Sequence, residues 1–92
     1  MGAFRIEIKA SAEKDLSRLE RPILVKVLEA VESLSDDPLP RQSTKLAGAE
    51  RLYRLRVGRY RVVYELDRPA QTITVHHVRH RRDAYNRLPR RS

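Results

Sequence analysis

The spacing of apolar residues divides this chain into an N-terminal and a C-terminal part. Apolar and polar residues alternate over residues 4–9, which predicts a strand with one buried face. Apolar residues then recur three or four positions apart over residues 12–19 and 24–34, as they do on one face of a helix. We expect Ser11 to cap the first helix and Pro22 to open the second. The N-terminal part is therefore predicted to be a strand followed by a helical hairpin.

The C-terminal part returns to a period of two. Residues 41–50 follow two prolines and are predicted to be a loop. Three alternating segments rich in Val, Ile, Tyr and Thr then predict an antiparallel meander: residues 52–57, 60–66 and 72–78. Residues 79–88 are expected to form a short final helix. The predicted fold class is α+β, with one domain over residues 1–92 in which the helical hairpin packs on a sheet made of the meander and the first strand.

The first hairpin of the meander has a two-residue loop, residues 58–59, which fixes its register. This register pairs Arg56 with Arg61 and places Arg54 and Glu65 on the same face as both. The other face, with its aromatic and aliphatic side chains, is expected to pack on the helices: Tyr53, Leu55, Val57, Tyr60, Val62 and Tyr64. Two opposed arginines are unfavourable unless an anion lies between them, and a guanidinium group suits a phosphate. The alternative is an ordinary solvated face of a half-covered sheet.

The distribution of charge supports the anion-binding interpretation. The net charge is +8, and residues 51–92 contain twelve arginines against three acidic residues, whereas residues 1–50 contain eight basic and nine acidic residues. A one-sided positive field attracts polyanions, so RNA, DNA or an acidic protein is the expected partner. The chain has no cysteine, and it has no apolar run long enough to span a bilayer. We therefore expect a cytoplasmic protein without a membrane partner.

Three histidines stand close together at the end of the meander: His76, His77 and His80. Neighbouring strand residues face opposite sides and no cysteine or obvious carboxylate completes a set of ligands, so we expect no metal site and no cofactor. Alternation predicts His77 in the core and His76 at an edge or in a groove. His80 is expected beside Arg79 and Arg81, where an imidazole is suited to proton transfer.

Two segments resemble the RelE/ParE superfamily of bacterial and archaeal toxins. They are residues 52–64, LYRLRVGRYRVVY, and residues 78–85, VRHRRDAY, and the likeness extends over nearly the whole chain. The sequence His-Arg-Arg with a tyrosine three positions later is typical of the RelE branch. The resemblance implies a RelE-like fold and the toxin of a type II toxin-antitoxin system. It also implies an mRNA interferase, an endoribonuclease that inhibits translation by cutting mRNA, often in the ribosomal A site, and an acidic antitoxin that blocks it.

By family position the resemblance assigns roles to individual residues. Arg54, Arg56 and Arg61 would line the phosphate site, Arg81 would hold the phosphate or the leaving group, and Tyr85 would stack on a base. The neighbouring basic residues are candidates for further RNA contacts: Lys45, Arg79 and Arg82.

The general base is left open by one departure from the family pattern. Well-known RelE members carry lysines at the positions of Arg54 and Arg56, and arginine is a poor general base because it keeps its proton. The base role would then pass to His80 or to the ribosome. Metal-free cleavage would give a 2',3'-cyclic phosphate and a 5'-hydroxyl end. Two alternatives remain, a ParE-like non-enzymatic inhibitor of DNA gyrase and a basic RNA-binding domain without toxin activity.

Overall fold

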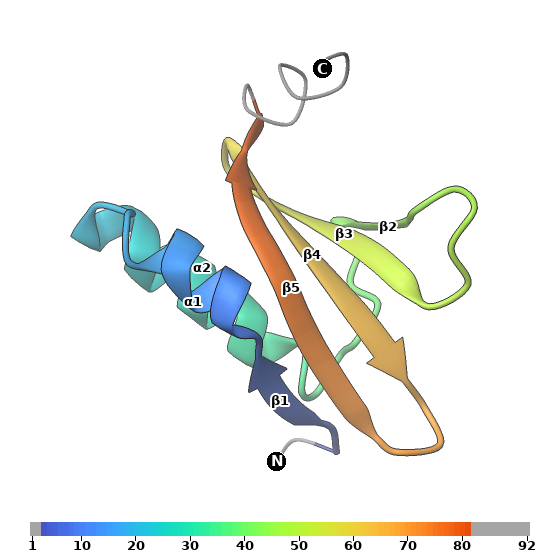
Figure 1. Cartoon of the computed structure of the whole chain (residues 1–92). Helices are drawn as coiled ribbons and strands as arrows, with labels where there is room; N and C mark the ends of the chain where they lie inside the picture. Colours follow the sequence, from blue (N-terminus) through green and yellow to red (C-terminus); the bar gives the residue numbers. More distant parts are fainter. Residues whose placement is uncertain (1–2, 82–92) are drawn as a thin grey trace.

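The computed structural model describes residues 3–81 and contains two helices and a five-stranded mixed sheet (Figure 1). The elements are β1 (Arg5–Ile8), α1 (Ala10–Leu16), α2 (Arg21–Ser33), β2 (Ser43–Lys45), β3 (Leu52–Val57), β4 (Tyr60–Asp67) and β5 (Thr72–His80). The strand order is β1-β5-β4-β3-β2, in which β1 runs parallel to β5 and the other neighbours are antiparallel. The predicted α+β fold and its meander are confirmed.

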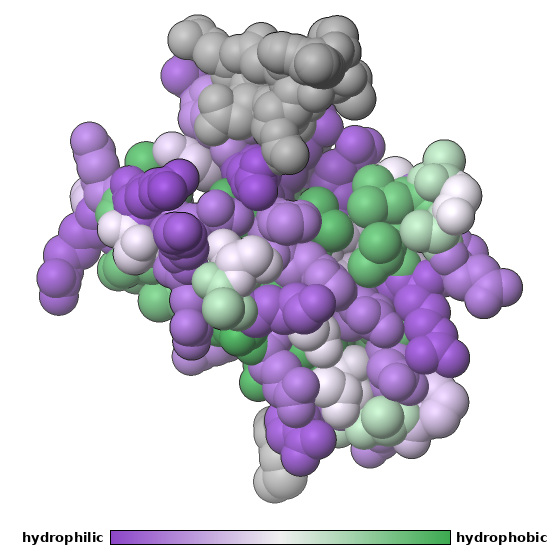
Figure 2. All heavy atoms as spheres, viewed as in Figure 1, coloured by the Kyte–Doolittle hydropathy of each residue, from purple (hydrophilic) through white to green (hydrophobic). Residues whose placement is uncertain are grey.

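The core lies between the helices and one face of the sheet. Its buried side chains come from both helices, the residue after α2 and three strands: Ala12, Leu16, Val27, Val31, Leu34, Leu55, Val62, Tyr64, Leu66, Ile73, Val75 and Val78. The first hairpin has the predicted register, with Arg56 opposite Arg61 and Leu55 opposite Val62. Alternation therefore directs the two arginines to the face that the helices do not cover. Hydrophilic residues predominate on the side of the molecule seen in Figure 2, with hydrophobic residues in smaller groups.

Two predicted element boundaries are wrong. Residues 43–45, expected within a loop, form β2 and pair with residues 53–55 of β3. An edge strand of Ser, Thr and Lys has no buried face of its own, so it leaves no apolar alternation in the sequence. Strand β5 continues to His80, so Arg79 and His80 belong to a strand and not to the predicted final helix. The rest of that predicted helix, beyond Arg81, lies outside the described residues.

Ser11 is not the N-cap of α1. The N-cap position is Lys9, which makes no side-chain capping hydrogen bond, and Ser11 already lies inside the helix. The Ser11 hydroxyl instead donates to the carbonyl oxygen of His76, with 2.7 Å between the oxygens. Strand β1 pairs with β5 only as far as Val75, and no other strand of residues 3–81 pairs with the rest of that edge of β5. Helix α1 supplies hydrogen bonds to this edge in place of a strand.

A β-bulge overturns the predicted orientation of His77. Val63 is paired with His77 and Tyr64 with Val75, so His76 is an extra residue in β5. The bulge moves Val78 into the core and leaves His77 half-buried opposite Val63, on the uncovered face. His76 lies on the same face, because its Nε2 is 3.2 Å from Oε1 of Glu65. The sequence predicts that the two imidazole rings face opposite sides of the sheet. In the structure they lie on the same side, with ring centroids 6.4 Å apart.

Candidate arginine pocket at the end of the sheet

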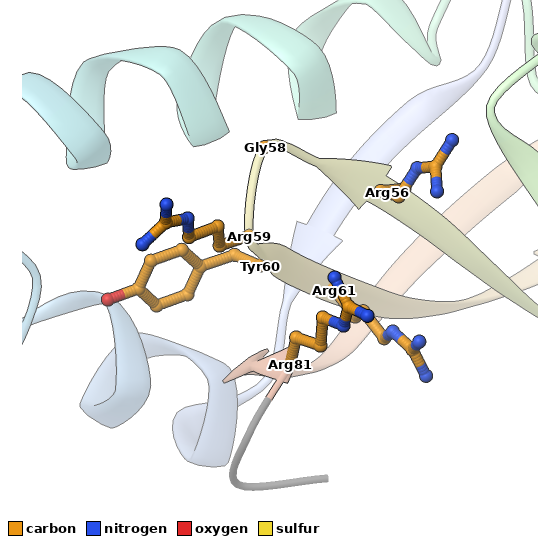
Figure 3. A pocket seen from close by; sticks show the side chains of 6 residues that line it. All are labelled: Arg56, Gly58, Arg59, Tyr60, Arg61 and Arg81. Atoms are coloured by element: carbon orange, nitrogen blue, oxygen red, sulfur yellow. The ribbon is translucent and has the colours of Figure 1, made fainter.

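A pocket of about 340 Å³ opens at the end of the sheet, beside the turn between β3 and β4 (Figure 3). It is lined by Arg56, Gly58, Arg59, Tyr60, Arg61 and Arg81. Four of these six residues are arginines and none is acidic. The structure thus brings together three of the arginines that the sequence analysis selected, Arg56, Arg61 and Arg81.

The backbone explains why these arginines converge. Gly58 adopts a φ of 58°, which only glycine adopts readily, and the turn it makes places Arg56 directly opposite Arg61. The backbone N–H of Arg81 donates to the carbonyl oxygen of Arg59 at 2.7 Å. This bond holds the end of β5 against the same turn. Residues from three segments of the sequence therefore meet at one end of the sheet.

The side chains around the turn separate into two directions. In Figure 3, Arg61 and Arg81 extend to the same side of the sheet end, whereas Arg59 and the ring of Tyr60 point the opposite way. Four guanidinium groups line the pocket and none of its described lining residues is acidic, so the site attracts anions. The pocket is therefore suited to a phosphate group.

The sequence does not single out Arg59 as a site residue, because its place in a two-residue loop predicts only a turn. The signal that could have identified it is its position in the sequence: a residue in a two-residue loop lies next to both strand ends, here those carrying Arg56 and Arg61. A basic residue at that position adds its positive charge to that of the two neighbouring strand ends.

Arg54 and Arg79 share the uncovered face but do not line the pocket. Arg54 precedes Arg56 by two positions and lies opposite Val63. Arg79 lies opposite Arg61. Its Nε is 3.3 Å from Oδ2 of Asp15 in α1, and its Nη2 is 3.4 Å from Nδ1 of His77.

Two other predicted site residues, His80 and Lys45, do not line the pocket. His80 is the cross-strand partner of Tyr60, and their rings meet edge to face with centroids 5.0 Å apart. By alternation this pair faces the side of the sheet opposite to Arg61. Lys45 lies opposite Tyr53 and lines a different pocket, formed by residues 45–50. Arg82 and Tyr85 lie outside the described residues.

The chemical capacity of the pocket follows from its lining. Arginines can bind a phosphate and stabilise the negative charge that develops on it, but they do not accept a proton at neutral pH. Residues 3–81 contain no group of three or more His, Asp or Glu side chains placed to hold a metal ion. Over the same range, no helix has the length and apolar character needed to cross a membrane.

By architecture, the chain is a small α+β protein whose arginines converge at one end of its sheet. Residues 6–85 match a family model described as the ParE toxin of the type II toxin-antitoxin system parDE. A protein of Methanocaldococcus jannaschii that carries the toxin name RelE1 is 32% identical over 85 residues, which are 89% of this chain and 94% of that protein. The chain belongs to the RelE/ParE superfamily of type II toxin-antitoxin toxins.

Solved structures agree with this assignment. The toxin of the archaeal RelE-RelB complex from Pyrococcus horikoshii superposes with a TM-score of 0.77 at 30% identity, covering 86% of this chain and 96% of that chain. The RelBE2 toxin-antitoxin complex from Mycobacterium tuberculosis gives the same TM-score and identity, and the match covers 86% of this chain and 99% of that chain. The RelE-like fold expected from the sequence is thereby confirmed.

Proposed function

We propose that this chain is an mRNA interferase, a toxin that cuts mRNA as an endoribonuclease and so inhibits translation. The observation that carries the proposal is that Arg56, Arg61 and Arg81 line one pocket. Attack of a ribose 2'-hydroxyl on the adjacent phosphate passes through a phosphorane rich in negative charge, which guanidinium groups stabilise. The products would be a 2',3'-cyclic phosphate and a 5'-hydroxyl end. This route requires no metal ion or cofactor.

The position of His80 bears on where the reaction takes place. A base must remove the proton of the 2'-hydroxyl, and arginine cannot do so at neutral pH. His80 packs on Tyr60 at the other side of the sheet from Arg61, so it is poorly placed for this step. The arrangement favours a toxin that supplies the phosphate site and acts on mRNA in the ribosomal A site, where the ribosome completes the acid-base machinery.

An acidic antitoxin is the second partner that we propose. The solved relatives from Pyrococcus horikoshii and Mycobacterium tuberculosis are complexes of RelE-type toxins with their antitoxins. On this chain, Val25 of α2 is 46% exposed, more than Leu39, the other large apolar side chain exposed within residues 3–81. An antitoxin that lies across α2 and reaches the arginine pocket would bury this residue and neutralise the positive charge.

The proposed activity is tested by translation in vitro with primer extension on the message. We expect discrete cuts with the wild-type chain that depend on ribosomes, and a loss of at least about 100-fold in cutting with Arg61→Ala or Arg81→Ala, as for removal of one oxyanion-stabilising donor. Arg68→Ala is the matched control, because Arg68 is an exposed arginine in the turn between β4 and β5, at the far end of the sheet. If the message stays uncut with the wild-type chain, whether or not translation stops, the chain is not an mRNA interferase.

A ParE-like inhibitor of DNA gyrase is the second candidate. It is favoured by the description of the matching family model and by the pocket lining within residues 3–81, which includes no histidine or carboxylate. Such an inhibitor acts by surface complementarity and needs no cleavage chemistry. Growth arrest that survives Arg61→Ala and Arg81→Ala, together with inhibited supercoiling by purified gyrase, would identify this function.

A further inference from the structure

The outer edge of β5 is held by two side chains of α1. Beyond Val75, no strand of the described part of the chain pairs with this edge, and Ser11 and Asp15 bond to it at His76 and Val78. Four residues on a helix rise about 6 Å, and two residues on a strand span about 6.6 Å. The spacing of Ser11 and Asp15 therefore matches that of His76 and Val78, so the helix follows the strand edge.

Asp15 makes the more consequential of these contacts. Its Oδ2 accepts the backbone N–H of Val78 at 3.0 Å and lies 3.3 Å from Nε of Arg79. The Asp15 side chain is 12% exposed and that of Arg79 is 30% exposed, so this ion pair is partly shielded from water and salt. A partly buried carboxylate that bonds to both the backbone and a neighbouring arginine fixes the strand and the guanidinium group together.

Arg79 belongs to a row of three arginines that crosses the sheet. Arg56 is opposite Arg61, and Arg61 is opposite Arg79, on strands about 4.8 Å apart. The contacts with Asp15 and His77 direct Arg79 to the outer edge of β5, and it does not line the pocket. Arg81 follows two residues later and is held on its inner side by Arg59.

We propose that Asp15 is a positioning residue for the arginine pocket: its carboxylate draws Arg79 out of the cross-strand row and anchors the end of β5, so that Arg81 is set beside Arg61. Arg79 then links α1 to β5 through its ion pair with Asp15, and it is not a phosphate ligand. This inference rests on the phosphate-binding function proposed above, and it assigns Asp15 no contact with RNA.

The test compares the full-length wild-type chain with Asp15→Asn and Glu13→Gln. The asparagine keeps an acceptor for the N–H of Val78 and removes only the charge. Glu13 is an exposed acidic residue on the same helix, so Glu13→Gln changes the net charge equally without touching the edge of β5. Cutting on the ribosome should fall about 10- to 100-fold in Asp15→Asn, the size of effect that a displaced site residue produces, and remain at the wild-type level in Glu13→Gln.

Binding of a single-stranded DNA oligonucleotide, which has no 2'-hydroxyl and is not cut, gives an independent readout. In Asp15→Asn, Arg79 becomes available to a phosphate, so the slope of log affinity against log salt should steepen by about 0.7, the contribution of one contact to a single strand. Hydrogen exchange should show the Val78 amide still protected.

Two results would overturn the positioning role. One is wild-type cutting and an unchanged salt slope in Asp15→Asn. The other is reduced cutting accompanied by loss of protection at Val78 and a lower melting temperature, which would reduce Asp15 to a folding residue. If the wild-type chain itself makes no cuts, the proposed function fails, and the Asp15 proposal is then decided by the salt slope and by hydrogen exchange.

Discussion

At the scale of single residues, Tyr64 shows how the core fixes an ionisable group. Its side chain is fully buried, and its hydroxyl donates to the carbonyl oxygen of Pro38 at 2.7 Å. Burial raises the pKa of Tyr64 above its ordinary value of 10.0. The folded state therefore keeps this proton at a pH where the unfolded chain has lost it, so the associated stability is complete below pH 10 and disappears as pH rises through the folded-state pKa.

Replacing Tyr64 by phenylalanine separates the hydrogen bond from the ionisation. At neutral pH we expect Tyr64→Phe to lower the free energy of unfolding by about 1 kcal/mol, because the Pro38 carbonyl loses its donor. Above about pH 10 the wild-type chain should lose stability faster than the variant, so the difference between them narrows. Urea unfolding at several pH values measures both effects. If the free energies of unfolding of the two chains differ by the same amount at every pH, the pKa of Tyr64 is not raised by folding.

At the scale of elements, the hairpin of β3 and β4 determines the geometry of the arginine pocket. Gly58 holds a positive φ, and a Cβ atom placed there would meet nothing within 4 Å. The cost of a larger residue is therefore one of backbone strain and not of crowding. Because Arg56 and Arg61 flank this turn, a strained turn would also shift the two guanidinium groups.

Gly58→Ala should accordingly affect both stability and RNA cutting. We expect a loss of about 1 to 2 kcal/mol in the free energy of unfolding, the cost of left-handed backbone for an L-residue, together with reduced cutting. Gly48→Ala is the matched control: Gly48 also has a positive φ, of 79°, and open space around it, but it lies in the loop before β3. The control should lose similar stability and keep its cutting activity. Equal activity in the two variants would show that the turn does not position the site.

The same hairpin shows what the sequence could predict. A two-residue loop allows few registers, so the pairing of Arg56 with Arg61 followed from the sequence alone. The bulge at His76 did not, because an extra residue in a strand carries no apolar signal of its own. Neither did the role of Ser11, since its hydroxyl finds a carbonyl 65 residues away in the chain instead of the adjacent helix turn. The local sequence predicted the register of this hairpin because the turn alone determines it, whereas the bond of Ser11 depends on a residue far away in the chain.

At the scale of the whole molecule, the excess of arginine is divided among different tasks. Arg56, Arg59, Arg61 and Arg81 line the pocket, whereas Arg79 pairs with Asp15, and Arg51 lies 3.5 Å from Asp67 at the other end of the sheet. The sequence identified the region of positive charge and three of the four arginines that line the pocket. It could not separate Arg79 from Arg81, because the partner of Arg79 lies on a helix far away in the sequence.

This division can be measured through the salt dependence of oligonucleotide binding. Arg81→Ala should reduce the slope of log affinity against log salt by about 0.7, because one phosphate contact with a single strand is lost. Arg68→Ala, at the far end of the sheet, should leave the slope unchanged. Equal reductions in both variants would indicate diffuse attraction by the net charge and no localised phosphate site.

The margins of the sheet have a consequence for how the protein behaves in concentrated solution. Its outermost strands are its shortest, β1 with four residues and β2 with three, while the long strands β4 and β5, of eight and nine residues, lie inside. A second copy adding to either margin would gain only a few backbone hydrogen bonds. Self-association into extended β assemblies is thereby disfavoured, and the chain is protected against aggregation by the lengths of its strands.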